Sequence, residues 1–525
     1  MLAVRSIKLL SLVLLLLLGG CTSTTGPRPG VSPTSAAATP PGTLGASPSG
    51  TPGERTPNSS VPQGDVMPVA VAEPVDVLIV GAGLSGLTTA YSLQKAGITY
   101  RVLELSPRVG GRVRTGTYPE GTQAEVGLAE FWTGNPAIEL ARELNVELEL
   151  VEPGLSSFMI DGKLYPFTTY SSNQEFIQSA LGPDYAEYQA WDKEMEKLVH
   201  QVESGDISPA LMELKEERFD QWLGKQKISE LAQKMVKAVI EPEIGTTINK
   251  ISALDGIAEW HLFVGKGATP QHAVGGNQKL TDAIAKAIGH ENISLNTQVT
   301  NVVDGKEGVE VRALDTTNFQ NRTFKAKAVV LTVPLFRLFE IQFTPRLSDE
   351  VYQAVHTQEW GAYFTAHCIL DKEAEKFWTV DGTNVLPILS GGPLGVIYPG
   401  NSGADSQDLV MINLLVTGNA AEAFNARTTS FDDVQLQLER AMEKTFPGSQ
   451  KMIRKWTFYR YHPRAIASWP VGRSRFDSLS EGLRKAHGHI YFAGDFTESS
   501  HSDGAMKSAL RVSSQLEAAL KKTKG

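Results

Sequence analysis

The spacing of apolar side chains predicts a strand, a helix and a second strand near the start of the folded region. Residues 77–80 form a continuous apolar run rich in β-branched side chains, which is typical of a buried strand. Apolar positions then recur at helical spacing over residues 84–95, and Gly97 ends that pattern. Residues 100–105 predict the next strand. This order predicts the beginning of a doubly wound α/β sheet.

Farther along, the pattern becomes helical and charge-rich and then returns to strands. Helices are expected over residues 189–202 and 211–223, and strands over 293–303, 309–313, 328–333, 362–370, 409–416 and 490–493, before a last helix over 504–522. We therefore expect a Rossmann-like α/β domain interrupted by two insertions that build an α+β domain. The expected parts of the first domain are 73–155, 269–335 and 456–525, and those of the inserted domain are 156–268 and 336–455.

The first 72 residues have a different character. A charged start, an apolar run over residues 9–18 and small residues before Cys21 predict a signal peptide over residues 1–20. The ending resembles the lipobox of bacterial lipoproteins, which implies cleavage before Cys21 and lipidation of its thiol; an ordinary signal peptide with an incidental cysteine is the alternative. Residues 21–72, rich in Pro, Gly, Ser and Thr, are predicted to be a disordered tether. We expect export and a lipid anchor, at the periplasmic face of an outer membrane or the outer face of a cell membrane.

Composition and charge limit the number of domains and the classes of function that the chain can have. A chain of 525 residues is too long for one hydrophobic core, which favours two domains. The formal net charge of -9 argues against a nucleic-acid partner, because no basic surplus exists to neutralise phosphates. Two cysteines exclude a disulfide framework, and Cys368 is interpreted as a buried apolar residue. No metal site is predicted.

The turn between the first strand and helix carries a glycine motif over residues 81–86. Glycines at Gly81, Gly83 and Gly86 permit a tight turn, close approach to a pyrophosphate and close helix packing. Glu104, at the end of the next strand, can accept hydrogen bonds from ribose hydroxyls and would repel the 2′-phosphate of NADP. The combination predicts a dinucleotide site.

The segment after Glu104 indicates which dinucleotide binds. Residues 106–112 end in Gly110, Gly111 and Arg112, and this segment resembles the flavin-containing amine oxidase family and its relatives, the protoporphyrinogen oxidases and carotene desaturases. The resemblance implies FAD, with Arg112 near the pyrophosphate. A covalent link through cysteine is not expected, because Cys368 falls in a predicted strand far from the matching segment. A surface turn with solvated arginines is the alternative.

Two later segments extend the resemblance. Residues 489–497 and 503–511 resemble the family's closing strand, loop and helix, which implies Asp495 near the ribityl chain or pyrophosphate and a helix start facing the flavin pyrimidine. Residues 274–280 and the following strand resemble the segment whose valine, here Val299, meets the adenine; an ordinary helix-to-strand turn is the alternative. The predicted cofactor-binding residues are Gly81, Gly83, Ser85, Gly86, Glu104, Gly111, Arg112, Val299, Gly494, Asp495, Asp503 and Ala505.

The substrate side is less defined. The stretch 332–343, which matches the segment where amine oxidases often carry a lysine that holds a water near flavin N5, contains no lysine. His501 and Trp469 are candidates to face the substrate, with loop capping and core packing as the respective alternatives. Carboxylates for a cationic substrate could come from Glu130, Glu241 or Glu243, whereas the arginines of residues 459–464 could bind a carboxylate.

The predicted function is that of an FAD-dependent amine oxidase. A hydride would move from the carbon beside an amine nitrogen to flavin N5, and the imine would hydrolyse. The substrate would be a small amine or amino acid, and oxygen or another acceptor would reoxidise the flavin, oxygen giving peroxide. Two alternatives remain: a desaturase or porphyrinogen-type oxidase that acts on C–C bonds, and a flavin-binding lipoprotein without turnover.

Overall fold

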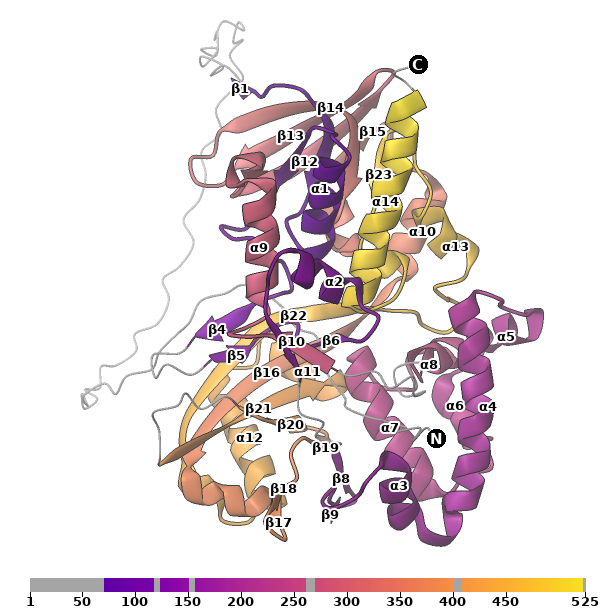
Figure 1. Ribbon diagram of the computed structural model, residues 1–525, viewed down its shortest axis with the longest axis vertical. Helices are drawn as coiled ribbons and strands as arrows, with labels where there is room; N and C mark the ends of the chain where they lie inside the picture. Colours follow the sequence, from indigo (N-terminus) through magenta and orange to yellow (C-terminus); the bar gives the residue numbers. More distant parts are fainter. Residues whose placement is uncertain (1–69, 118–122, 151–155, 261–269, 401–407, 523–525) are drawn as a thin grey trace, which may run out of the picture. The chain divides into compact units, whose positions relative to one another are not determined.

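A parallel sheet forms where the sequence predicts it. The computed structural model describes residues 70–117, 123–150, 156–260, 270–400 and 408–522; the predicted signal peptide, Cys21 and nearly all of the tether lie outside them. In that sheet β2 (Val75–Val80) lies between β3 (Tyr100–Leu103) and β14 (Asn321–Leu331), and β11 (Ile293–Ser294) and β23 (Ile490–Phe492) add parallel neighbours. Helices α1 (Leu84–Lys95), α9 (Gln278–Ile288) and α14 (Ser502–Lys522) cover one face (Figure 1). The Rossmann-like α/β prediction is confirmed.

The other face of this sheet carries a second apolar layer. Antiparallel strands β12 (Thr297–Gly305) and β13 (Gly308–Asp315) continue the sheet beyond β14, and β15 (Gln342–Thr344) pairs with β12. Apolar side chains of these strands pack with those of α10 (Asp349–Thr357) and α13 (Ser478–Leu483). The single strand predicted over 293–303 is wrong: it is β11 and β12, separated at Asn296, whose φ of 53° breaks the extended conformation.

The inserted domain is built on a seven-stranded sheet. Its strand order is β22 (Ile453–Ser468), β16 (Glu359–Asp371), β21 (Leu409–Thr417), β20 (Gly395–Pro399), β19 (Ile388–Gly391), β8 (Ser157–Ile160) and β9 (Lys163–Tyr165). Helices α11 (Gly418–Asn425) and α12 (Phe431–Thr445) pack against one face of it (Figure 1). Cys368, in β16, is fully buried there, as predicted.

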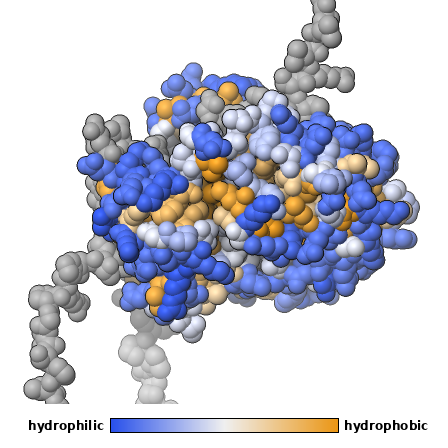
Figure 2. Space-filling view, turned by 90° about the horizontal axis from the view of Figure 1, so that it is seen from below, coloured by the Kyte–Doolittle hydropathy of each residue, from blue (hydrophilic) through white to orange (hydrophobic). Residues whose placement is uncertain are grey.

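Six further helices form a bundle beside the inserted sheet. They are α3 (Asn173–Leu181), α4 (Tyr185–Ser204), α5 (Pro209–Glu213), α6 (Phe219–Gly224), α7 (Glu230–Ile244) and α8 (Ala253–Glu259). The helix predicted over 211–223 is wrong, because the chain is extended at Glu217 and divides that stretch into α5 and α6. The face seen from below is mostly hydrophilic and carries a hydrophobic area near its centre (Figure 2). Within the described ranges, no helix combines the length and apolar character needed to cross a membrane.

Three predicted boundaries move. Strand β1 (Ala70–Val71) pairs with β14, so the first sheet begins inside the predicted tether. Strand β15 pairs with β12 although it falls in the predicted second insertion, whereas β22 belongs to the inserted sheet although its C-terminal part was assigned to the first domain. The pairing of a strand decides which sheet it belongs to. Because the partner strands are distant in sequence, local patterns do not show these boundaries.

Candidate active site

The glycine turn after β2 has no room for a side chain at Gly81 or Gly86. Gly81 has a φ of +110°, and a Cβ added to Gly86 would lie 2.0 Å from the carbonyl oxygen of Gly81. The N-cap of α1 is Gly83, and no side chain caps this helix start. Its first backbone N–H groups therefore face outward from the turn, as binding of a phosphate requires.

The loop with the second glycine motif packs directly onto that turn. The N–H of Gly110 donates to the carbonyl of Ala82 over 2.8 Å, and a Cβ on Gly111 would lie 2.8 Å from the Cα of Gly83. The carboxylate of Glu104 accepts from the N–H groups of Ala82 and Ser106 over 2.7 and 2.8 Å. The two motifs thus form one rigid unit around the position of a nucleotide.

A cavity of about 460 Å³ runs from this unit to the start of α14. Most of the predicted cofactor-binding residues line it, and His501 lies on the same wall. The predicted residues in the lining are Gly81, Gly83, Ser85, Glu104, Gly111, Arg112, Val299, Gly494, Asp495 and Ala505. The wall suits FAD, because glycine backbone, a ribose-binding acid and a helix start follow one another along it.

Two predicted cofactor-binding residues lie outside this lining. Gly86 serves the turn by its close packing against Gly81. Asp503 accepts a hydrogen bond from the hydroxyl of Ser499 over 2.9 Å and pairs with Lys507 at 2.7 Å. Its neighbours Ser502 and Ala505 reach the cavity instead.

Arg112 and Asp495 join the two ends of the folded chain. The Arg112 guanidinium donates to Asp495 through both terminal nitrogens, with Nη1 at 2.5 Å from Oδ2, and Nη1 also donates to the carbonyl of Ala465 over 3.0 Å. Burial would lower the pKa of Arg112, but the charge of Asp495 raises it above its usual value. Arg112 therefore keeps its positive charge, and both residues of the pair line the cavity.

The two candidate substrate-facing residues are placed differently. His501 lines the cavity, and its Nε2 lies 2.7 Å from Oε2 of Glu259. Trp469 is fully buried in the apolar layer behind the first sheet, where its indole N–H donates to Ser480 over 3.2 Å. Trp469 therefore has the core-packing role, and the cavity wall contains His501 alone of the two.

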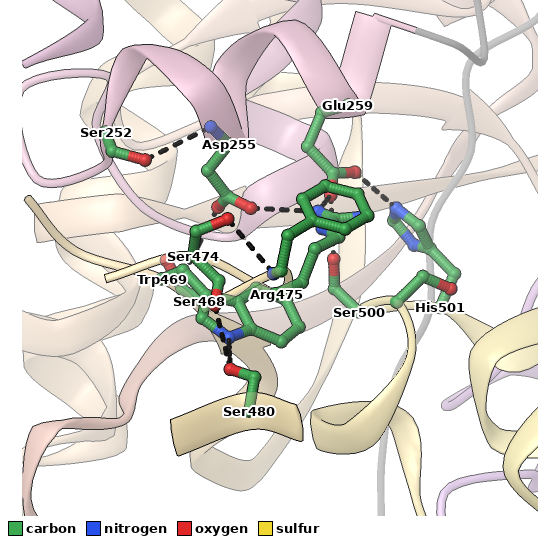
Figure 3. Close-up of polar contacts among 12 residues, drawn as sticks. Ser252, Asp255, Glu259, Ser468, Trp469, Ser474, Arg475, Ser480, Ser500 and His501 are labelled. Atoms are coloured by element: carbon green, nitrogen blue, oxygen red, sulfur yellow. Dashed lines mark hydrogen bonds and ion pairs between the residues drawn. The ribbon is translucent and has the colours of Figure 1, made fainter. Parts of the chain in front are cut away.

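His501 belongs to a buried ion-pair network that sequence reasoning missed (Figure 3). Glu259 is fully buried and accepts from Arg475 and from the hydroxyl of Ser500, the latter over 2.9 Å. Arg475 also donates to Asp255 over 2.9 Å. The available signal is that α8 is buried along its whole length yet carries Asp255 and Glu259 four residues apart, on one face.

Near His501 lies a second group of acids. Burial raises the pKa of Glu243 to about 8, the charge of His501 opposes this rise, and Glu259 adds to it. Burial also raises the pKa of Glu130 well above its usual range, and Glu243 adds to the rise. In the described structure, buried Oε2 of Glu130 and the buried hydroxyl of Tyr398 have no hydrogen-bond partner.

The other charged candidates for substrate binding, Glu241, Arg460 and Arg464, make contacts away from the cavity. Glu241 accepts from the N–H of Ile248 over 3.2 Å and lies 3.9 Å from Lys237. Arg460 donates to the carbonyls of Phe424 and Thr429, and Arg464 is exposed over the ring of Phe336. None of the three lines the cavity, and no lysine does so among the described residues. Likewise, the described part of the chain holds no group of three potential metal ligands.

The site combines a glycine turn with a ribose-binding acid at one end and the start of α14 at the other. On a doubly wound sheet with an inserted domain, such a site defines a flavin-dependent oxidoreductase. The model of the flavin-containing amine oxidoreductase family matches residues 84–516, so the chain belongs to that family. It is an oxidoreductase that acts on amines, and its cofactor is FAD.

Known relatives match along most of their length. The chain is 25% identical to an L-amino-acid oxidase of Bothrops moojeni over 484 residues, covering 85% of this chain and 90% of that protein. An L-amino-acid oxidase of Gloydius blomhoffii is 26% identical, with 84% and 89% covered. Similar solved structures are putrescine oxidase bound to putrescine (TM-score 0.70, 22% identity, 85% and 100% covered) and cyclohexylamine oxidase from Brevibacterium oxydans (TM-score 0.70, 19% identity, 85% and 99% covered). These likenesses confirm the fold.

Proposed function

We propose that this protein is an FAD-dependent oxidase of small cationic amines. The observation that carries the substrate class is the buried, unpartnered Oε2 of Glu130, beside Glu243 and the unpartnered hydroxyl of Tyr398. An ammonium group donates three hydrogen bonds and carries the charge that buried carboxylates need. A carboxylate substrate would meet these acids with the wrong charge.

The residues of the chain would prepare the amine for oxidation. FAD, held by the glycine turn, Glu104, Arg112 and Asp495, supplies the hydride acceptor at N5. Once ionised, Glu243, whose pKa lies at about 8, takes a proton from the ammonium, since the neutral amine is the form that loses hydride. The substrate carbon gives up a hydride and becomes an iminium carbon, which water hydrolyses to a carbonyl compound and an amine. Oxygen receives the two electrons with two protons and leaves as peroxide.

Anaerobic mixing of the purified holoenzyme with separate substrates tests this proposal. Diamines and monoamines are expected to bleach the flavin absorbance, and amino acids are expected to bleach it much more slowly. Bleaching by amino acids alone would contradict the substrate class. A flavin that stays oxidised with every amine, or that only a polyene or porphyrinogen reduces, would contradict the amine oxidase function itself.

We also propose that the protein is exported and anchored to a membrane through Cys21. Support comes from the charged start, the short apolar run and the small residues before Cys21, followed by a long polar stretch suited to a tether. A diacylated cysteine with an acylated amino group provides more than one chain, which stable anchoring requires.

A further inference from the structure

A buried network of four charged groups ends at the wall of the cofactor cavity. Arg475 and Asp255 are 5% and 3% exposed, and Glu259 is fully buried. Of the four groups only His501, at the end of the chain of contacts, lines the cavity. It directly precedes α14, whose first residues line the same wall.

His501 contacts the buried carboxylate of Glu259 directly, with 2.7 Å between Nε2 and Oε2. The same network holds a second carboxylate, Asp255, and one guanidinium, that of Arg475. A carboxylate at this distance favours the charged form of an imidazole. The contact therefore favours the protonated form of His501.

We propose that Glu259 holds His501 as an imidazolium against the flavin, and that its charge stabilises the negative charge the flavin gains on reduction. Arg475 and Asp255 are positioning residues, because they reach the cavity only through Glu259. The imidazolium would lie at a cavity that no lysine lines among the described residues. A fixed charge in a water-poor site is more effective than the same charge in water.

The pH range in which His501 is positively charged follows from the groups that face it. Burial alone would lower the pKa of His501, but Glu259, with contributions from Glu243 on α7 and Asp503 on α14, raises it to about 9. The positive charge is therefore present below about pH 9 and lost as pH rises through that value. Arg112 and Asp495 also line the cavity, but they pair with each other. Glu243 ionises near pH 8, so the variant Glu243→Gln separates its effect from that of His501.

Sulfite titration of the holoenzyme tests this proposal without any substrate. Sulfite adds reversibly to flavin N5 and places a negative charge on the ring, and absorbance reports its affinity. In the wild type, affinity is expected to fall as pH rises through about 9, beyond the change shown by His501→Asn. In Glu243→Gln the fall should persist at a lower pH, because Glu243 contributes to the raised pKa of His501. At neutral pH, His501→Asn is expected to bind sulfite about tenfold more weakly or worse. A wild-type profile without a fall near pH 9, or with the same fall as His501→Asn, would overturn the proposal.

Two further variants separate charge from structure. Glu259→Gln keeps a side chain that can bond Ser500 and is expected to move the pH midpoint down by about one unit or more. His489→Asn is the matched control, because His489 pairs with Asp304 at 2.6 Å on the first sheet; its profile should stay unchanged. Bound FAD per protein and circular dichroism check folding. A wild-type midpoint in Glu259→Gln would overturn the positioning role.

The inference rests on the proposed function as a flavin enzyme, but failure of the His501 role can be distinguished from failure of that function. Sulfite needs no amine, so inactivity with every amine alongside the expected sulfite profile contradicts the proposed substrate class alone. Amine oxidation with a sulfite profile independent of pH contradicts the role of His501 alone.

Discussion

At the scale of single residues, Glu130 is partly buried, and its buried Oε2 has no hydrogen-bond partner among the described residues. Its variant Glu130→Gln keeps the shape but removes the charge that would face an ammonium group. We expect kcat/KM for a diamine to fall about 10- to 100-fold, because a hydrogen bond to a charged group contributes about 1.5–3 kcal/mol. Steady-state peroxide release measures this change.

Glu241→Gln is the matched control for that prediction. Glu241 lies on the same helix as Glu243 but bonds Ile248 and approaches Lys237 instead. Its variant should retain kcat/KM within about a factor of two to three. Equal losses in both variants would mean that the effect comes from general destabilisation and would remove the support for ammonium binding at Glu130.

Gly86 is the residue where a single methyl group has the largest predicted effect on the cofactor. Because the added Cβ would meet the carbonyl of Gly81 at 2.0 Å, Gly86→Ala must deform the turn. We expect the purified variant to retain little FAD, measured as the ratio of absorbance at 450 nm to that at 280 nm. Gly482→Ala serves as the control, since nothing lies within 4 Å of its added Cβ; a normal FAD content in Gly86→Ala would contradict the fit.

At the scale of elements, the turn between β10 (Pro270–Ala273) and α9 positions the backbone segment that leads into Glu130. Fully buried Asn277 donates to the carbonyls of Leu128 and Ala129 over 2.8 and 2.7 Å, and its Oδ1 accepts from Ala273 over 2.8 Å. It therefore fixes the backbone that leads into Glu130.

Asn277→Ala should loosen this segment. Loss of these bonds leaves buried groups unpaired, so the free energy of unfolding should fall by about 2 kcal/mol or more. The KM for the diamine should rise as well, because Glu130 loses its fixed place. Asn292→Ala, which removes one amide bond to Ile288 on the other end of α9, should leave KM unchanged. Denaturant unfolding and steady-state kinetics test both; an unaltered KM in Asn277→Ala would contradict the positioning role.

Element boundaries show where periodicity is insufficient. The predicted start of α1 at Leu84 and its end at Lys95 agree with the structure, because a glycine turn and Gly97 bound an unbroken helical pattern. The stretch 211–223 has a similar pattern, yet Glu217 is extended there, and its carbonyl accepts from the N–H of Ala253. A tertiary backbone contact overrides the local preference.

At the scale of the whole molecule, the number of titratable thiols tests the proposed anchor. The chain has two cysteines, and Cys368 is buried with a thiol whose pKa burial raises well above its usual range. We expect the membrane-extracted mature protein to show no reactive thiol when native and one in denaturant, because lipidation would block Cys21. Cys21→Ser, expressed with the same signal, should leave the membrane fraction and also show one thiol in denaturant. Two thiols in the denatured wild type would contradict lipidation.

The FAD site was largely readable from the sequence. Glycines that permit a turn, and an acid at a strand end, act through local backbone geometry, and local geometry depends on neighbours in sequence. Gly81, Gly83 and Glu104 line one cavity, and their binding of FAD stays a prediction. His501 was a candidate as well, but Trp469 was an equal one, and only packing separates a residue on the cavity wall from one in the core.

The charge network was decided by tertiary structure alone. Arg475 meets Glu259 across 216 positions of sequence, and His501 meets it across 242. Residue type along a chain shows which groups can ionise, but burial and partners fix the energy of each charge, and these arise from long-range packing. The sequence by itself thus determined the cofactor and the family, through short motifs. The tertiary structure determined that the buried Oε2 of Glu130 has no partner among the described residues, and that His501 contacts Glu259 at the wall of the cavity.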